Sequence, residues 1–142
     1  MRLTEEQTMI RDMARQFARE RLAPGVAARD ASGDFPLAEV REMGGLGLMG
    51  MTVAEAWDGA GADYVSYVLA MEEIAAADGA ASTIMSVNNA PVCAAVERFG
   101  SEEQKERFLR PLAKGEMLGA FALTEPQAGS DASALKTKAT RD

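Results

Sequence analysis

The sequence contains no histidine and a single cysteine, Cys93. Without histidine the chain lacks the commonest general base and the commonest metal ligand of proteins, and one cysteine cannot form a disulfide within the chain. These absences exclude histidine-based catalysis and metal sites built from histidine and cysteine clusters. They favour a metal-free protein, and we expect a cytoplasmic location.

Blocks of basic residues and long apolar runs are also missing. The chain has 22 acidic and 15 basic residues, a net charge of −7, and no lysine and arginine cluster that would favour nucleic acid or anionic lipid. No apolar stretch approaches the roughly 20 residues that cross a membrane. The first residues include Glu5 and Glu6, which is typical of neither a signal peptide nor a transit peptide. We therefore expect neither nucleic acid nor a membrane as a partner.

The chain has 142 residues and an apolar content of 47%, which is enough for a domain with a true core. Its first helix is predicted by a capping box, in which Thr4 is followed by Gln7. Apolar residues then recur at helical spacing, so the helix should reach about Leu22. Pro24 and Gly25 are predicted to stop it.

The middle of the chain is predicted to hold two helices on either side of a loop. A short helix should start near Pro36, which suits a first helical turn, and end in the glycine-rich residues 44–47. Residues 52–62 are predicted to form a loop in which Trp57 is a packing anchor. Asp63 can cap the next helix. That helix should be buried on more than one face, because one side carries Tyr64, Tyr67, Met71 and Ile74 and another carries Val65, Val68 and Leu69.

Residues 80–99 are almost wholly small or apolar and are predicted to form a central helix. Pro91 removes one backbone donor and crowds the preceding turn, so the helix either bends there or breaks into two helices. Ser101 followed by Gln104 repeats the capping-box pattern and predicts a further amphipathic helix, which Gly115 ends.

The character of the sequence changes after residue 115. Residues 117–123 form a short continuous apolar run, which predicts a buried strand, and residues 135–140 alternate weakly and could begin a second strand. The expected fold is mainly α: a helical domain over residues 1–115, followed over residues 116–142 by the first strands of a truncated β domain.

The segment most informative about function runs from Phe121 to Asp131. A hydroxyl at Thr124 follows the predicted strand, and Gly129 allows close backbone approach to a ligand beside the hydroxyl of Ser130. An apolar wall with a few fixed polar groups suits a planar cofactor with polar edges. The glycine spacing matches neither a P-loop nor a dinucleotide fingerprint.

Residues 122–131, Ala-Leu-Thr-Glu-Pro-Gln-Ala-Gly-Ser-Asp, resemble the signature of the acyl-CoA dehydrogenase family. Three further segments also resemble this family: residues 85–89, residues 99–105 and the glycine-rich residues 44–61. The resemblance covers essentially the whole chain, and its finer features are nearest to short-chain or branched-chain members.

The resemblance implies a subunit with an N-terminal helical domain, a middle β domain and a C-terminal helical bundle, in which FAD lies between the last two. It implies that residues 121–130 wall the flavin, with Thr124 near the pyrimidine edge and Ser130 near both cofactor and acyl-CoA. The implied cofactor-binding residues are Phe121, Ala122, Leu123, Thr124, Gly129 and Ser130. The implied reaction oxidises a saturated acyl-CoA to the 2,3-enoyl-CoA, with electrons passing through FAD to an electron-transfer flavoprotein. A homotetramer is the implied assembly.

The carboxylate base of this family is expected beyond residue 142, so no catalytic residue is assigned within the chain. Glu125 lies inside the signature, but the family does not use this position as the base. Two alternatives remain open: a non-catalytic helical module, and a flavin oxidase or monooxygenase of the same fold.

Several residues also have a purely structural interpretation. Thr124 and Ser130 could cap an ordinary turn, as most such residues beside proline and glycine do. Asn88 and Asn89 are at least as well explained as buried side chains that satisfy nearby backbone groups, and we leave them out of the site. Cys93, Tyr64 and Tyr67 are expected in the core.

Overall fold

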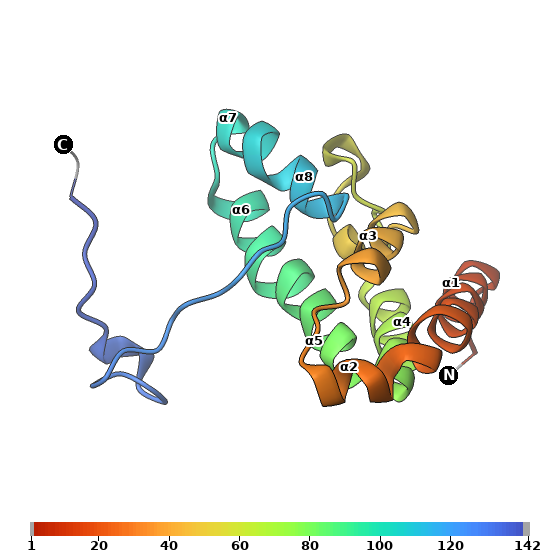
Figure 1. Cartoon of the computed structure of the whole chain (residues 1–142). Coiled ribbons are helices and arrows are strands. Elements are labelled where there is room, and N and C mark those ends of the chain that lie inside the picture. Colours follow the sequence, from red (N-terminus) through yellow and green to blue (C-terminus); the bar gives the residue numbers. More distant parts are fainter. Residues whose placement is uncertain (1, 141–142) are drawn as a thin grey trace.

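The computed structural model describes residues 2–140, and helices α1–α8 with intervening π and 3-10 turns form its body (Figure 1). Helix α1 spans Glu5–Phe17 and begins with the predicted capping box, because the Gln7 amide donates to Thr4 Oγ1 at 3.1 Å and the Thr4 amide donates to Gln7 Oε1. A π-helical turn, η1 (Ala18–Leu22), continues it to the predicted end. No helix among the described residues is long and apolar enough to cross a membrane.

Pro24 and Gly25 turn the chain without ending its helical course, contrary to the prediction. They lie in a 3-10 turn, η2 (Ala23–Gly25), which leads directly into helix α2 (Val26–Ser32). Proline is tolerated there because its missing N–H belongs to a first turn. The stop comes instead at Gly33, whose φ of 76° is a left-handed conformation that glycine adopts without strain.

Helix α3 spans Leu37–Gly45, as predicted from the proline and the glycine-rich stretch. Two 3-10 turns follow, η3 (Leu48–Gly50) and η4 (Glu55–Trp57), within the predicted loop region. Trp57 packs against a small apolar cluster, and the cations of Lys105 and Arg110 lie 5.7 and 5.1 Å from its ring centroid. The packing role predicted for this tryptophan is therefore confirmed.

Helix α4 spans Tyr64–Ala77, and Asp63 caps it by accepting from the Ser66 amide at 2.7 Å. Ala70 and Ile74 are fully buried, and α4 packs against α1 and α5. Tyr67 is half-buried against the same core. The prediction that Tyr64 lies in the core is wrong, because its side chain is 72% exposed. Tyr64 is the first residue of α4, and its face of this first turn points to solvent.

The central helix predicted over residues 80–99 is continuous and passes through a π-helical stretch. Helix α5 (Gly79–Val87) passes into η5 (Asn88–Cys93) and then into α6 (Ala94–Phe99). Pro91 lies within η5, so the missing N–H is accommodated by wider turns and the helix does not break. A second capping box, between Ser101 and Gln104, opens α7 (Glu102–Gln104), which continues through η6 (Lys105–Leu109) into α8 (Arg110–Ala113).

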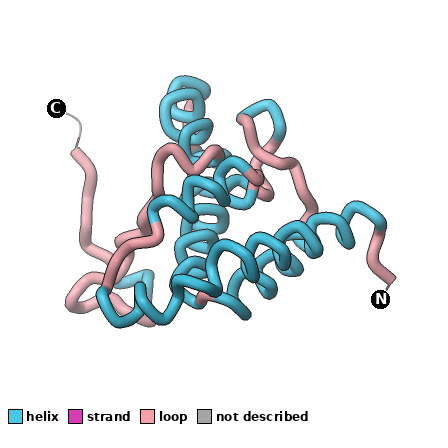
Figure 2. The backbone as a smooth tube through the Cα atoms, turned by 45° about the vertical axis from the view of Figure 1, so that its right-hand side comes forward, coloured by secondary structure: helices cyan, strands magenta, loops and turns pink. Residues whose placement is uncertain are grey.

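The predicted strands over residues 117–123 and 135–140 are wrong, because no strand occurs in the part of the chain that the structure describes (Figure 2). Residues 120–124 run in non-regular conformation away from the helices, and the one bridge here pairs Glu125 with Ala128. A strand requires a hydrogen-bonding neighbour, and none of the other described segments runs beside this one. The predicted burial of the apolar run is also wrong, because Met117, Phe121 and Leu123 are exposed.

Candidate functional site

The predicted site begins where the chain leaves the helical body at Gly119. The amide of Gly119 donates to Asn88 Oδ1 at 2.9 Å, and its Cα packs tightly on Val92. Leu118, one residue earlier, packs against the main apolar core. The segment is thus attached to the central helix two residues before Phe121.

The apolar residues that follow are presented to solvent. Phe121 is 55% exposed and Leu123 is 43% exposed, and Ala122 between them is also exposed. Large apolar side chains usually lie in a core, so a run of them on an extended segment marks a surface for a ligand or for other protein.

A tight turn follows the apolar run. The amides and carbonyls of Glu125 and Ala128 pair with each other at 3.1 and 3.0 Å, with Pro126 and Gln127 forming the corner. Ala128 is almost fully buried. Asp131 then caps the 3-10 turn η7 (Ala132–Ala134) by accepting from the Ser133 amide at 3.1 Å.

Glu125 holds the turn against the chain that follows it. Its carboxylate accepts from the amides of Lys136 and Thr137, each at 2.9 Å, and from the side chains of Thr137 and Gln127. These donors, the Thr137 hydroxyl first, lower the pKa of Glu125 to about 2. A carboxylate with this pKa and these partners is a poor base, which agrees with its omission as a catalytic residue.

Glu125→Gln is expected to loosen residues 136 and 137 while the helical body keeps its stability. The lowered pKa means that the ionised carboxylate contributes fully above its ordinary pKa of 4.5 and loses this contribution as pH falls toward about 2. Amide exchange at Lys136 and Thr137, measured across that pH range, checks this. Glu116→Gln is the control, and equal exchange at both amides in the variant and the native chain would contradict it.

The two hydroxyls of the predicted site make no hydrogen bond to any residue from 2 to 140. The side-chain hydrogen bonds around the turn are made by Glu125, Gln127, Asp131, Ser133 and Thr137. The alternative in which Thr124 and Ser130 cap the turn is therefore not the one adopted. Within the same described residues, a Cβ added at Gly129 would contact nothing within 4 Å, so crowding does not explain this glycine.

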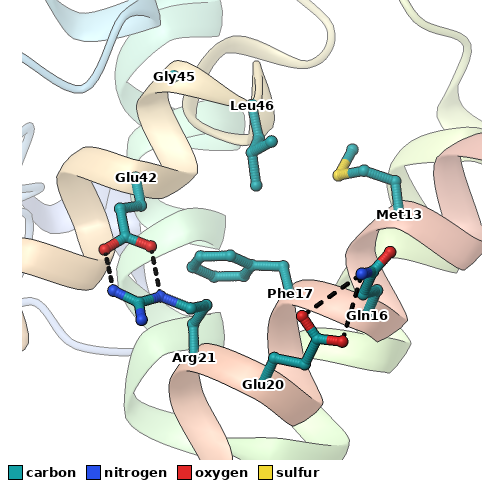
Figure 3. Close-up of a pocket in the computed structure, with 8 residues that line it drawn as sticks. All are labelled: Met13, Gln16, Phe17, Glu20, Arg21, Glu42, Gly45 and Leu46. Carbon is teal, nitrogen blue, oxygen red and sulfur yellow. Dashed lines mark hydrogen bonds and ion pairs between the residues drawn. The ribbon is translucent and has the colours of Figure 1, made fainter.

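The cavities of the helical body lie apart from this segment. One of about 380 Å³ lies between α1 and α3, where Phe17 and Leu46 face each other beside the ion pair of Arg21 with Glu42 (Figure 3). A larger one of about 820 Å³ lies between the α2–α3 connection and the start of α5. Neither is lined by a residue of the predicted site. No cluster of potential metal ligands occurs within residues 2–140.

Comparison with known families identifies the chain. Residues 4–116 match the model of the acyl-CoA dehydrogenase, N-terminal domain. The chain belongs to the acyl-CoA dehydrogenase family. The resemblance seen in the signature is thereby confirmed, although the match ends before the signature begins.

Individual acyl-CoA dehydrogenases extend the similarity through the signature. The acyl-CoA dehydrogenase of Bacillus subtilis (strain 168) is 45% identical over 141 residues, covering 99% of this chain and 37% of the relative. The mitochondrial short-chain specific acyl-CoA dehydrogenase of Bos taurus is 44% identical over 140 residues, covering 99% of this chain and 34% of that protein. The chain thus spans about a third of the length of these relatives.

A solved structure shows the same fold. The glutaryl-CoA dehydrogenase of Mycobacterium smegmatis in complex with FADH2 superimposes with a TM-score of 0.92 and 37% sequence identity, covering 99% of this chain and 36% of that chain. This supports the helical arrangement.

Two fully buried asparagines of this acyl-CoA dehydrogenase chain have the structural role that the sequence favoured. Asn89 donates to the carbonyls of Leu48 and Met85 and accepts from the Met51 amide, all within 2.9 Å. Sequence reasoning missed that Asn88 accepts from the Gly119 amide, in the segment that leads into the signature. The available signal was an amide side chain in an otherwise apolar helix, since a buried amide needs partners.

Cys93 is confirmed as a core residue. It is fully buried in the small cluster with Leu109 and Leu112, and burial raises the pKa of its thiol to about 12. A thiol that stays protonated at neutral pH is a poor nucleophile, so Cys93 has no part in the candidate site.

Proposed function

We propose that residues 121–130 form one wall of the FAD site of an acyl-CoA dehydrogenase. Family membership supports this, together with one structural observation: the hydroxyls of Thr124 and Ser130 are unbonded within the described residues, beside exposed apolar side chains. In the proposed site Phe121, Ala122 and Leu123 cover an apolar face of the ring system. Thr124 donates to its polar edge, and Gly129 admits backbone close to the cofactor beside Ser130.

The residues present fit a flavin by their chemistry. Burying Phe121 and Leu123 against a planar ring would remove apolar surface from water, which stabilises the bound state by roughly 25 cal/mol per Å². Hydroxyl and turn amide groups at the end of the segment match polar edge atoms. FAD, when bound, supplies the hydride acceptor, whereas the residues of this chain bind and orient it.

The proposed activity of the complete protein is oxidation of a saturated acyl-CoA to the 2,3-enoyl-CoA, with an electron-transfer flavoprotein as acceptor. The similarity to short-chain specific relatives favours short acyl chains. We further propose that it works as a homo-oligomer in the cytoplasm, and that residues 116–142 belong to its middle domain. We assign no base within this chain. Glu125 is not assigned this role, because its carboxylate is held in structural hydrogen bonds that lower its pKa.

The deciding experiment uses the complete product of the gene, reconstituted with FAD. Bleaching of the flavin absorbance on adding butyryl-CoA or a related acyl-CoA is the expected result, and no bleaching with any acyl-CoA would overturn the proposal. Turnover with a flavoprotein or dye acceptor identifies a dehydrogenase. Peroxide formed with oxygen as the direct acceptor would identify an oxidase of the same fold.

Thr124→Val in the same FAD-reconstituted protein is expected to weaken FAD binding by roughly three- to tenfold, because it removes one hydrogen bond and keeps the side-chain shape. Flavin fluorescence titration measures the dissociation constant. Thr140→Val, an exposed threonine outside the signature, is the control. Equal affinity in both variants would remove Thr124 from the site.

A further inference from the structure

Asn88 connects the helical body to the signature segment through a fully satisfied side chain. It is completely buried, and its Nδ2 donates to the carbonyls of Met49 at 2.8 Å and Leu112 at 3.0 Å. Both donor hydrogens are thus used, and Oδ1 remains to accept from the Gly119 amide at 2.9 Å. The two donated bonds fix the orientation of the amide group, so its oxygen can point only toward the departing segment.

The bond to Gly119 is the last hydrogen bond between the helical body and the segment before the signature. Met117 donates to the Pro111 carbonyl two residues earlier. Within residues 2–140, the amides from Ala120 to Thr124 donate to no backbone carbonyl and to no side chain. The direction in which residues 120–124 leave the body is therefore set at Gly119.

Gly119 also approaches the helix too closely for any side chain. A Cβ at this position would lie 2.5 Å from Val92 Cγ1 and 2.8 Å from Val92 Cβ. Val92 is four residues after Asn88 in the π-helical stretch η5, so both contacts come from one part of the central helix. The π-helical stretch η5 thus provides one polar and one steric contact to the same glycine. Single π-helical turns within α-helices often occur at functional sites.

We propose that Asn88 is a positioning residue for flavin binding, which sets the direction of the signature segment by holding the Gly119 amide against the central helix. This rests on the proposed function, because it assigns a role toward the same FAD site. Asn88 touches neither cofactor nor substrate in this proposal. It acts through Gly119 on residues 121–130.

Asn89 offers a matched control for the test. It has the same residue type and the same complete burial, and it makes three hydrogen bonds, but none reaches the signature segment. Asn88→Ala and Asn89→Ala should therefore cost similar global stability. Only Asn88→Ala should release residues 119–124.

The measurement is NMR of the 142-residue chain. In Asn88→Ala, we expect Gly119 amide exchange to rise roughly tenfold more than exchange of the helical amides, because one hydrogen bond is lost locally. We also expect lower backbone order parameters for residues 120–124. In Asn89→Ala, Gly119 should change only as the helices do. Equal behaviour of Gly119 and residues 120–124 in the two variants would overturn the proposal.

Gly119→Ala keeps the question open to test if Asn88→Ala fails to fold. Its methyl group clashes with Val92, so it should displace the segment and break the bond from the Gly119 amide to Asn88. Asn88 should keep its bonds to the carbonyls of Met49 and Leu112. Unchanged order parameters for residues 120–124 in this variant would also overturn the proposal.

A functional readout separates this inference from the proposed function. In the complete gene product, Asn88→Ala and Gly119→Ala should weaken FAD binding, whereas Asn89→Ala should not. If the native protein binds no FAD, the proposed function fails and the NMR comparison still decides whether Asn88 directs the segment. If FAD binds equally well to Asn88→Ala and Asn89→Ala, the positioning role fails and the proposed function stands.

Discussion

Asp78→Ala is expected to lower the free energy of unfolding by about 3–4 kcal/mol, because Asp78 has two roles in one buried position. Its Oδ1 accepts from the Ala81 amide and caps α5, and its Oδ2 pairs with Arg29 Nη2 at 2.8 Å. The two side chains are 4% and 14% exposed. Removing the acid leaves a largely buried guanidinium with Glu39 and the Leu22 carbonyl alone. Urea denaturation followed by circular dichroism measures the loss.

The control for this prediction is Asp63→Ala at the start of α4. Asp63 also caps a helix, but it is exposed, and among residues 2–140 its side-chain partner is the neutral Gln7 amide and no cation, so its loss should cost about 1 kcal/mol. The difference between the two variants measures the combined effect of the burial of Asp78 and its ion pair with Arg29. Equal losses would contradict an energetic role for the Arg29 contact.

The stability contributed by Asp78 should also depend on pH. Burial alone would raise the pKa of Asp78, but the Ala81 amide and the Arg29 guanidinium outweigh it and lower the pKa below its ordinary value of 3.8. The contribution is therefore fully present above about pH 4 and is lost as pH falls through the lowered pKa. Asp78→Asn keeps an oxygen for the cap but should lack this part of the acid dependence.

Gly44→Ala is expected to destabilise the protein by about 1–3 kcal/mol, whereas Gly45→Ala at the next position should be neutral or stabilising. A Cβ at Gly44 would lie 2.0 Å from the Lys114 carbonyl oxygen, so backbone would have to move. A Cβ at Gly45 meets nothing within 4 Å among the described residues, and Gly45 has no positive φ. Alanine there gains helix propensity without strain.

Thermal or urea unfolding of the two glycine variants checks this pair of opposite signs. The clash at Gly44 reflects a close backbone contact between α3 and the residues that follow α8, where a Cβ at Gly44 would also lie 3.1 Å from the Cα of Gly115. Gly50 makes a second close approach, because a Cβ there would lie 2.6 Å from the Cβ of Ala113. A stable Gly44→Ala variant would mean that α8 can shift away from α3 at little cost.

The helix boundaries of the helical body could be predicted largely from local sequence signals. Both capping boxes and the aspartate cap of α4 form as predicted, because a side chain three residues from its partner amide needs no tertiary contact to bond it. The capping role of Asp78 and helix α2 were missed. Helix α2 follows Pro24. The sequence alone does not distinguish a proline in the first turn of a helix from a proline that ends one.

The conformation of the signature segment was not predicted, and its role as a site stays a prediction. Continuous apolar character at residues 117–123 indicated burial, and burial in a short run indicated a strand. An apolar segment is expected to pack against some surface. Its hydrophobicity does not indicate whether that surface belongs to residues 2–140 or to another partner. The exposed Phe121 and Leu123 show this distinction directly.

By itself, the sequence determined much of the local structure, such as both capping boxes and the end of the last helix at Gly115, and it determined a signature whose residue types suit a flavin. Only the tertiary structure decided which polar groups are already occupied. Glu125 binds the amides of residues 136–137 and Asn88 binds Gly119, whereas Thr124 and Ser130 bind no other described residue. The physical reason is that Asn88 and Gly119 are 31 residues apart, so the hydrogen bond between them depends on how the helices pack. Helix packing depends on contacts between many segments and is not encoded by any one of them.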